Sequence, residues 1–247
     1  MQNKVTFITG SAKRIGAYTA QHLHNLGSNV VIHCNHSRLE AENLCKQLNQ
    51  KRAKSARLVQ GDLSDISSIE RIGQQAIDSF GKLDILINNA SSFYPTPIGT
   101  ITEKDWSSLV GSNMQGPLFL SQLCSTELAK NNGAIINMVD IHAAKPLQQH
   151  TLYCMAKSAL VAMTQSLALE LAPEVRVNGV APGAILWPEQ EMSDIDKQEI
   201  LKHIPAGRLG SQADIAQAIE YLISANYVSG QIIAVDGGRS ISSQTKA

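Results

Sequence analysis

The chain has 247 residues, of which 43% are hydrophobic and 17% are charged. That length allows one large α/β domain, and the composition excludes both a disulfide-stabilised mini-protein and an intrinsically disordered chain. Lysine plus arginine and aspartate plus glutamate each number 21, so the formal net charge is zero and no overall field attracts nucleic acid or an anionic membrane. We therefore expect neither partner.

No segment approaches the roughly 20 apolar residues of a membrane-spanning helix, and a predicted core strand begins within a few residues of Met1, with no signal peptide before it. A cytoplasmic protein is expected. The four cysteines form no C-x-x-C pair, so we predict buried free thiols and propose no metal site. His22 and His24 have polar neighbours on a predicted helix, where we expect them to be solvated.

Short, largely β-branched apolar runs alternate with longer amphipathic segments, which is typical of repeated βαβ units and a parallel sheet buried on both faces. The predicted strands are Val5–Thr9, Asn29–Cys34, Ala56–Gln60, Ile85–Asn88, Ala134–Val139, Arg176–Val180 and Ile232–Val235. The predicted helices lie near residues 14–26, 38–50, 65–80, 103–130, 153–172 and 212–224. Without a repeat, a linker or a composition shift, we predict one α/β domain over residues 1–247, a Rossmann-like doubly wound sheet flanked by helices.

Local signals mark several helix starts and loops. Helix-start patterns occur at Ser37-x-x-Glu40, Thr102-x-x-Asp105 and Ser211-x-x-Asp214. The irregular stretches Ser91–Thr100 and Pro182–Ser193 follow predicted strand ends, where open parallel sheets bind ligands, so we expect both to form substrate walls. Residues Ser240–Ala247 are polar and are predicted to form a loose tail.

The first predicted strand passes directly into a helix through the segment Thr9–Gly16. Gly10 permits the tight turn and Gly16 lets the helix pack on the strand. The start of the helix offers free N–H groups and a partial positive charge to a pyrophosphate. The segment therefore predicts a dinucleotide site.

The end of the second strand distinguishes NAD from NADP, because an acidic residue there binds the ribose of NAD and repels the 2′-phosphate of NADP. No carboxylate precedes Glu40 in this segment. The residues placed to receive a phosphate are His36, Ser37 and Arg38, together with Lys13 or Arg14. The sequence favours NADP(H).

Tyr153 and Lys157 lie four residues apart on a predicted helix, so both side chains project from one face. Lowering a phenol pKa of about 10 by about three units takes about 4 kcal/mol. One ammonium at about 4 Å and an effective dielectric constant near 20 supplies roughly that free energy. The geometry permits an acid–base pair.

Three further motifs accompany this pair: Asn88-Asn89-Ala90 closes the fourth strand, Asn113 lies in the following helix, and Pro182-Gly183 closes the sixth strand. With the glycine loop, these motifs resemble the short-chain dehydrogenase/reductase family over essentially the whole chain. The resemblance implies a seven-stranded parallel sheet and a homotetramer. It makes Tyr153 the proton donor, gives Lys157 the task of lowering the phenol pKa and holding the nicotinamide ribose, and lets Asn113 support a proton-relay water.

Two positions depart from the family pattern. Arg14 replaces the third loop glycine, and Asp140 replaces the catalytic serine thirteen residues before the tyrosine. Together with the loop Asn89–Pro97, these changes resemble the pteridine reductase branch, which reduces pterins or folates with NADPH. The implied nucleotide contacts are Gly10, Lys13, Arg14, Ile15, Asn35, His36, Ser37, Asp62, Leu63, Asn89, Ala90, Ser91, Tyr153, Lys157, Pro182 and Gly183.

A pterin is flat and amide-like, so Phe93 is placed to hold it against the nicotinamide while Ser91 and Arg14 bind its polar edge. Reduction of its C=N bond needs a proton at nitrogen, which by resemblance Asp140 and Tyr153 share. Trp187 lies in the expected substrate loop, where a lid contact and a subunit contact are equally plausible.

Asp140 also introduces a conflict, because a carboxylate beside Tyr153 raises the pKa that Lys157 is expected to lower. A coupled pair of acids, with Asp140 partly protonated in the reactive complex, resolves it. Two alternatives stay open: a carbonyl reductase, such as a 3-oxoacyl-carrier-protein reductase, and a catalytically idle NADP-binding sensor. Asp140 argues against the first, and intact Tyr153, Lys157 and Asn113 argue against the second.

Overall fold

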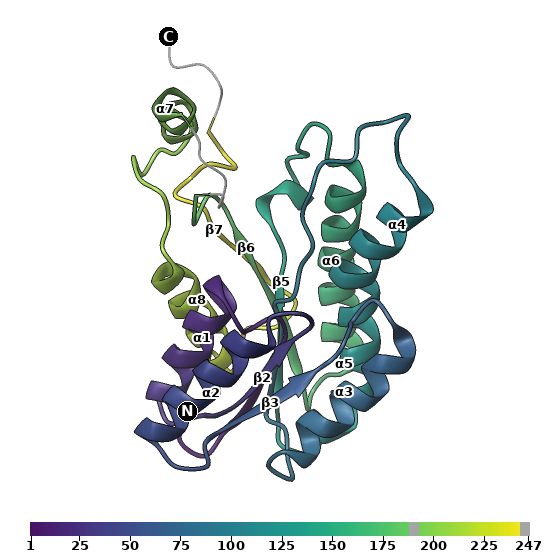
Figure 1. The fold of residues 1–247 in the computed structure, drawn as a ribbon, viewed down its shortest axis with the longest axis vertical. Helices are drawn as coiled ribbons and strands as arrows, with labels where there is room; N and C mark the ends of the chain where they lie inside the picture. The colour runs from purple at the N-terminus through teal and green to yellow at the C-terminus, as the bar shows by residue number, and fades with distance from the viewer. Residues whose placement is uncertain (188–192, 243–247) are drawn as a thin grey trace.

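A computed structural model of the protein describes residues 1–187 and 193–242. Seven strands form one sheet in the order β3-β2-β1-β4-β5-β6-β7, and all neighbouring pairs run parallel (Figure 1). The strands are β1 Val5–Ile8, β2 Asn29–Cys34, β3 Ala56–Gln60, β4 Ile85–Asn88, β5 Ala134–Met138, β6 Arg176–Pro182 and β7 Ile232–Val235. Each matches a predicted strand within two residues, which confirms the doubly wound α/β fold.

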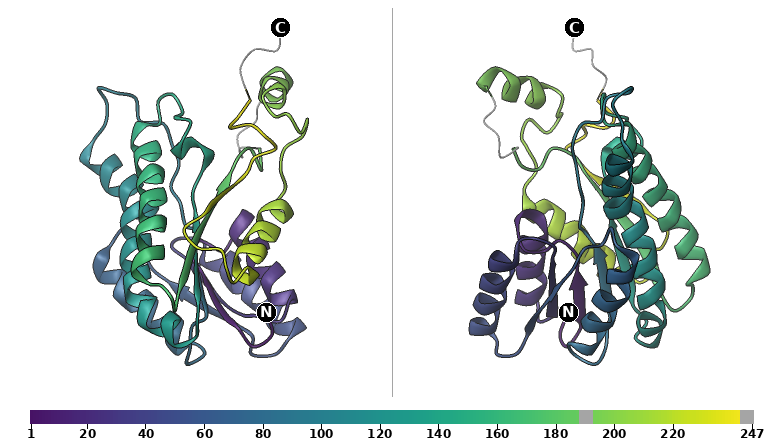
Figure 2. Two further views of the ribbon diagram at one scale, coloured as in Figure 1. Left: turned by 180° about the vertical axis from the view of Figure 1, so that it is seen from behind. Right: turned by 45° about the vertical axis from the view of Figure 1, so that its right-hand side comes forward.

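Helices cover both faces of the sheet. The α-helices are α1 Arg14–Asn25, α2 Arg38–Lys51, α3 Ile66–Asp78, α4 Glu103–Val110, α5 Gly116–Lys130, α6 Thr151–Glu170, α7 Asp194–Lys202 and α8 Gln212–Ser224. One apolar core lies between the sheet and α1, α2 and α8, and a second lies between the sheet and α3, α5 and α6 (Figure 2). The near-continuous apolar strands have two faces to bury, so they need both layers.

The single helix predicted near 103–130 is interrupted. A π-helical turn, Gly111–Gln115, separates α4 from α5. Within it the side-chain amide of Asn113 donates to the Leu109 carbonyl at 3.0 Å. A side chain that occupies a carbonyl one turn back disturbs the regular ladder, which explains a break that hydrophobic periodicity does not reveal.

Helix α7 was not predicted. None of its residues is buried, so its sequence carries no periodic apolar stripe. Ser193 begins it by accepting a hydrogen bond from the Asp196 amide at 3.1 Å. The loop expected over Pro182–Ser193 is therefore followed at once by a helix, and its residues 188–192 lie outside the described part of the chain.

Two of the three predicted helix-start signals are capping boxes. Thr102 and Asp105 exchange hydrogen bonds at the start of α4, and Ser211 and Asp214 do so at the start of α8. Ser37 is different, because its side chain makes no capping hydrogen bond to α2. Helix α2 begins at Arg38, directly after Ser37, so the predicted start is confirmed, while Glu40 pairs with Lys13 at 2.6 Å.

The two histidines on α1 are held by protein partners. His24 is buried and its Nε2 lies 2.6 Å from the Ser55 hydroxyl, which contradicts the expected solvation. His22 is partly buried and its Nε2 lies 2.6 Å from a carboxylate oxygen of Glu220. Both have their partners on other elements, which neighbouring residues in the sequence cannot reveal.

The four cysteines are free thiols, as expected. Three are buried, whereas Cys45 is only partly buried. Burial raises the pKa of Cys45 to about 11 and that of Cys124 to about 12. Both groups are therefore protonated at neutral pH.

Helix α6 contradicts the expectation that no segment of the chain approaches the length and apolar character of a membrane-spanning helix. Within the described residues it is long and apolar enough, by length and composition alone, to cross a membrane. Here it packs along the sheet beside β6 and carries Tyr153 and Lys157 inward. Its apolar character is that of a core helix covering a parallel sheet.

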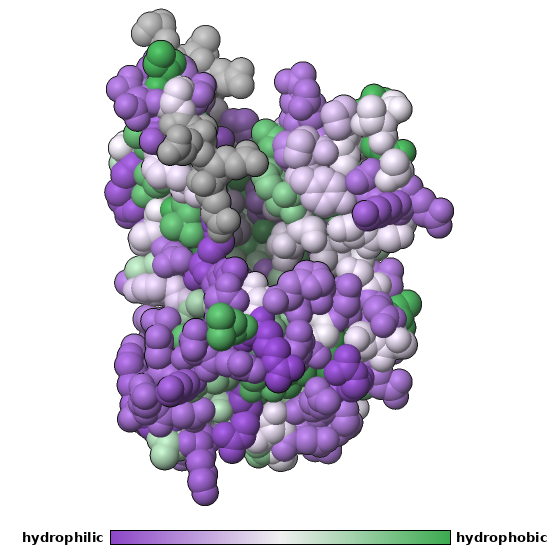
Figure 3. All heavy atoms as spheres, viewed as in Figure 1, coloured by the Kyte–Doolittle hydropathy of each residue, from purple (hydrophilic) through white to green (hydrophobic). Residues whose placement is uncertain are grey.

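The strand order places the ligand crevice. The chain winds outward from β1 to β3 and then returns to β4 on the other side of β1, so β1 and β4 border the point where the direction of winding changes. Ligands of open parallel sheets bind at the carboxyl ends of such strands. The surface is hollowed at this end, between the part that carries α7 and the part that carries α4 and α6 (Figure 3).

Candidate functional site

A cleft of about 560 Å³ opens at the carboxyl ends of the strands near this switch point. It brings together eleven of the predicted nucleotide contacts: Gly10, Lys13, Arg14, Ile15, Asn35, His36, Asp62, Leu63, Asn89, Ala90 and Ser91. The other predicted contacts, Ser37, Tyr153, Lys157, Pro182 and Gly183, do not line it. It is also lined by residues that the sequence did not single out as contacts: Gly16, His33, Ser64, Ser92, Ser108 and Ser112.

The loop between β1 and α1 is built for close approach. Gly10 has φ +59°, and a Cβ there would lie 2.8 Å from the Cα of Ala90. A Cβ on Gly16 would lie 2.5 Å from the Gly10 carbonyl oxygen. The side-chain amide of Asn89 donates to the carbonyls of Thr9 and Gly10 at 2.8 and 3.0 Å, which fixes the loop against the end of β4.

This loop fits a pyrophosphate. Lys13 precedes α1 but provides no side-chain cap, so its side chain leaves the first N–H groups of the helix unblocked. Arg14 has φ +51°, a left-handed conformation that costs an L-residue roughly 1 kcal/mol. Arg14 therefore holds a backbone conformation that glycine adopts without strain.

The expected 2′-phosphate end is less basic than the sequence indicates. The ammonium of Lys13 lies 2.6 Å from a carboxylate oxygen of Glu40, and this contact lowers the pKa of Glu40. The guanidinium of Arg38 lies 2.7 Å from a carboxylate oxygen of Glu42. Each of these two cations thus has an acidic neighbour, and Lys13, Arg14 and His36 line the cleft.

At the end of β5, the hydroxyl of Tyr153 donates to a carboxylate oxygen of Asp140 at 2.8 Å. The other oxygen of Asp140 accepts from the His142 amide, also at 2.8 Å. Burial raises the pKa of Tyr153 far above its usual range, and the negative charge and hydrogen bond of Asp140 raise it further. The conflict expected between Asp140 and a lowered phenol pKa is thus decided in favour of a protonated phenol.

Lys157 lies over the ring of Tyr153, and its implied role of lowering the phenol pKa stays a prediction. Its side chain is 1% exposed, and its ammonium donates to the Met138 carbonyl at 2.8 Å and lies 5.6 Å from the centroid of the Tyr153 ring. Burial lowers the pKa of Lys157 to about 8, against the opposite effect of Asp140. The Tyr153 hydroxyl is therefore hydrogen-bonded to Asp140, and the Lys157 ammonium lies over the tyrosine ring.

Asn113 is fully buried in the π-helical turn and its side chain is occupied by protein groups. Its carbonyl oxygen accepts from the Ser91 hydroxyl at 2.7 Å, and its amide donates to the Ser92 carbonyl at 2.8 Å. The side chain therefore fixes the first part of the loop 91–100, beside the cleft.

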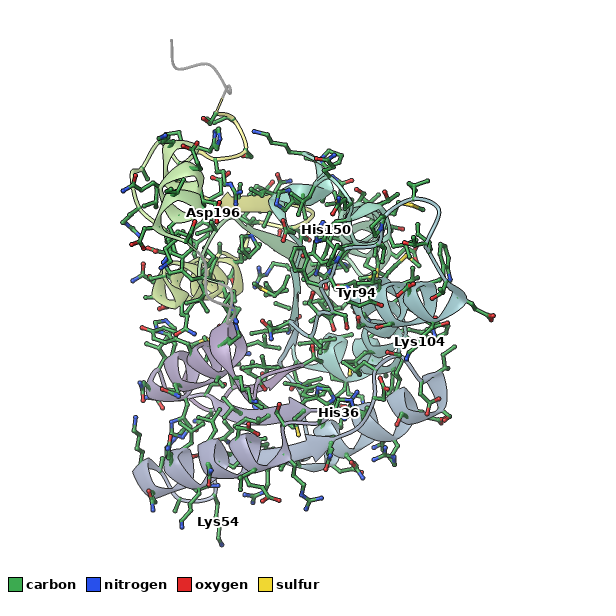
Figure 4. All side chains as sticks on the ribbon, turned by 45° about the horizontal axis from the view of Figure 1, so that its top comes forward. His36, Lys54, Tyr94, Lys104, His150 and Asp196 are labelled. Carbon is green, nitrogen blue, oxygen red and sulfur yellow. The ribbon has the colours of Figure 1, made fainter. Side chains whose placement is uncertain are left out.

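Phe93 is 55% exposed, so it is not a core aromatic. Its ring meets that of Tyr153 edge-on, with centroids 4.8 Å apart, and stacks on the His150 imidazole at 4.6 Å with 16° between the planes. No sequence pattern places His150 here, apart from its position three residues before the tyrosine. His150 and Tyr94 lie on one side of the hollow and Asp196, on α7, lies on the other (Figure 4).

The end of β6 contributes support. A Cβ on Gly183 would lie 2.6 Å from the Cβ of Asp236, and the Gly183 amide donates to the Val235 carbonyl at 3.0 Å. Trp187 is half-buried and does not line the cleft. The predicted Pro182–Gly183 contact and both readings of Trp187 stay predictions, and the predicted tail beyond residue 242 lies outside the described residues.

Known proteins with similar sequences align with almost the whole chain. The model of a family described as enoyl-(acyl carrier protein) reductase matches residues 10–240. Pteridine reductase 1 of Leishmania tarentolae is 35% identical, with 96% of each chain aligned. A 3-oxoacyl-[acyl-carrier-protein] reductase of Haemophilus influenzae is 34% identical over 96% of this chain and 98% of that protein.

A third relative widens the range of chemistry. A (2S)-[(R)-hydroxy(phenyl)methyl]succinyl-CoA dehydrogenase subunit of Thauera aromatica is 33% identical over 98% of each chain. Each of the three named relatives aligns with at least 96% of this chain, and they differ in the substrate that their names state. The comparisons therefore identify a family of oxidoreductases more narrowly than they identify a substrate.

Proposed function

The chain belongs to the short-chain dehydrogenase/reductase family, and from that premise we propose that it is an NADPH-dependent reductase of pterins. It would convert dihydropterins to tetrahydropterins and would also accept dihydrofolate. The observation that carries the proposal is the hydrogen bond of 2.8 Å from Tyr153 to Asp140, where the family has a serine. A second acid in place of a hydroxyl donor suits a substrate that must be protonated at nitrogen.

The reaction adds a hydride to the carbon of a C=N bond and a proton to its nitrogen. When bound, NADPH supplies the hydride and becomes NADP⁺. Tyr153 delivers the proton from its hydroxyl, which is protonated at neutral pH. Asp140 accepts the hydrogen bond of that phenol, and after the transfer it would relay a proton from water to the phenolate.

The exposed ring of Phe93 supports a flat heterocyclic substrate. It stands beside the Tyr153 ring at 4.8 Å, close to the proton source, and its exposed surface suits a planar ligand. Ser91 and Arg14 both line the cleft and offer a hydroxyl and a guanidinium to the polar edge of a pterin.

The choice of NADPH over NADH rests on the end of β2. The segment after it offers His36 and Ser37 and no acidic residue before Glu40, so nothing there repels a 2′-phosphate. The side chain of Ser37 is not used to cap α2, which leaves its hydroxyl for a ligand. Lys13 would exchange Glu40 for the phosphate when the nucleotide binds.

A carbonyl reductase acting on 3-oxoacyl thioesters is the second candidate, favoured by the similarity to 3-oxoacyl-[acyl-carrier-protein] reductases. A ketone oxygen develops negative charge during reduction, and a carboxylate hydrogen-bonded to the proton donor opposes that charge. Asp140 therefore argues for the pterin over the thioester.

The test follows NADPH oxidation with a dihydropterin, dihydrofolate and a 3-oxoacyl thioester, in the wild type and in the Asp140→Asn and Asp140→Ser variants. We expect the wild type to reduce the pterin, Asp140→Asn to lose at least about tenfold in kcat, and Asp140→Ser to shift toward the thioester. Wild-type turnover of the thioester alone would overturn the pterin proposal. Full pterin turnover by Asp140→Asn would remove Asp140 from the proton path.

A further inference from the structure

His33, near the end of β2, uses both ring nitrogens on main-chain partners. The Gly10 amide donates to its Nδ1 at 3.1 Å, and its Nε2 lies 3.0 Å from the Gly61 carbonyl oxygen. A main-chain N–H can only donate and a carbonyl can only accept, so the ring must be neutral with its proton on Nε2. The two partners fix this tautomer.

The main chain adds to the attachment. The Ser11 amide donates to the His33 carbonyl at 2.9 Å, and the His33 amide donates to the Ser11 hydroxyl at 3.1 Å. The imidazole is 2% exposed and meets the ring of Phe7 edge-on. Three hydrogen bonds therefore join His33 to the loop after β1, and a fourth joins it to the loop after β3.

Both loops form walls of the cleft. Gly10 belongs to the phosphate loop, and Gly61 immediately precedes Asp62 and Leu63, which line the opposite wall. His33 lies between them and lines the cleft itself. His33 thus joins the two walls through its imidazole ring, alongside the main-chain hydrogen bond from the Gly61 amide to the Cys34 carbonyl at 3.1 Å.

The ring does not act as a cation toward phosphate. Burial lowers the pKa of His33 to about 4, although the Gly61 carbonyl and the charge of Asp62 act in the opposite direction. Asp62 is the charged group that faces it across the cleft wall. A proton on Nδ1 would also point at the Gly10 N–H, so the contact itself excludes the charged form.

We propose that His33 is a positioning residue for the nucleotide, a neutral two-sided link that holds the phosphate loop and the loop after β3 at the separation the cofactor requires. This inference rests on nucleotide binding within the proposed function and is independent of the pterin. The competing reading is a core histidine that contributes to folding stability alone.

Three variants separate the two bonds. His33→Asn keeps an acceptor near Nδ1, His33→Gln keeps a donor near Nε2, and His33→Phe keeps the ring without either group. The matched control is His24→Asn, because His24 is also buried and hydrogen-bonded but does not line the cleft. The measurements are the Kd for NADPH and for NADH by fluorescence titration, the Tm without nucleotide, and KM against kcat.

We expect His33→Phe to raise the Kd for NADPH about tenfold or more, and the KM with it, while kcat at saturating NADPH stays within about twofold. His33→Asn and His33→Gln should each recover part of the affinity. His24→Asn should lower the Tm and leave the Kd unchanged. If His33→Phe does not fold, the Asn and Gln variants carry the comparison.

His33 variants that lose Tm but bind NADPH as tightly as the wild type would overturn the inference and leave the proposed function standing. A drop in kcat without a rise in KM would overturn it as well. Wild-type protein that binds neither NADPH nor NADH would overturn the proposed function, and this inference with it.

Discussion

The two halves of the ligand site are built from different chemical groups. At the ends of β1, β2 and β3, backbone amides and carbonyls, glycines and a neutral imidazole form the wall. Beside the end of β5 lie ionisable side chains, with the Tyr153 hydroxyl donating to Asp140 and the Lys157 ammonium over the tyrosine ring. The first half makes a shape that suits one nucleotide, and the second half makes a set of opposed charges that suits a reaction.

Burial disfavours the charged forms of Tyr153 and Lys157, as the direction of each pKa shift shows. Burial holds the phenol of Tyr153 protonated and makes the ammonium of Lys157 easier to deprotonate. In the half formed at the ends of β1, β2 and β3, which we call the nucleotide half, the buried ring of His33 is neutral and so buries no charge. Substitutions in the two halves should therefore separate chemistry from binding.

The largest expected effect is at Tyr153. Replacing it with phenylalanine removes the proton donor while keeping the ring that meets Phe93, so we expect kcat to fall roughly 10²- to 10⁴-fold. The Kd for NADPH should change by less than about threefold, because the nucleotide half is untouched. Substrate reduction and fluorescence titration measure the two quantities.

An idle nucleotide sensor makes a different forecast for this variant. A protein that only senses NADPH would show no substrate reduction in the wild type and no loss in Tyr153→Phe. Retained turnover in Tyr153→Phe would contradict the assignment of the proton donor.

The next largest effect concerns Lys157 and alkaline pH. Burial lowers its pKa from 10.5 to about 8, so between these values the unfolded chain binds more protons than the folded one and this group makes stability rise with pH. The gain is about 3 kcal/mol across the window. Denaturant unfolding at pH 7 and pH 10 measures it, with Lys157→Met as the variant that should lack the rise.

The activity should move in the opposite direction. Above pH 8 the ammonium of Lys157 loses its proton, so kcat should decline where stability rises. A kcat that stays constant to pH 10 would show that the lysine charge is not needed for the reaction.

A similar experiment at acidic pH addresses the nucleotide half. The pKa of His33 is lowered from 6.5 to about 4, so the stability contributed by its neutral form is complete above pH 6.5 and is lost as the pH falls toward 4. The loss is about 3 kcal/mol. His33→Asn, which does not titrate, should show a shallower decline, and an equal decline in both proteins would assign the effect to other groups.

The smallest effects come from two serines that begin helices. Ser211→Ala removes a capping box from α8, away from the cleft, and should cost about 1 kcal/mol of stability without changing the Kd for NADPH. Ser37→Ala removes a hydroxyl that caps nothing, so stability should hold while the Kd for NADPH rises roughly tenfold. The reverse pattern in the pair would place Ser37 outside the nucleotide site.

The local patterns of the sequence predicted elements well and contacts unevenly. Alternation of apolar runs placed every strand within two residues, because burial on both faces constrains each strand locally. It missed α7, which buries nothing, and the break at Asn113, where a side chain enters the helical ladder. It also misjudged His24, whose partner lies on an element distant in the sequence, and it did not reveal that Glu40 pairs with Lys13.

The sequence by itself determined the doubly wound fold, the glycine loop and the residue types at the catalytic positions, since all of these follow from short-range spacing. Only the tertiary structure decided how the charged and polar side chains pair. It placed Glu40 on Lys13, the phenol of Tyr153 on Asp140, and His33 between Gly10 and Gly61. The reason is physical: a pKa and a hydrogen bond depend on burial and on neighbours across the sheet, and these exist only once the chain has folded.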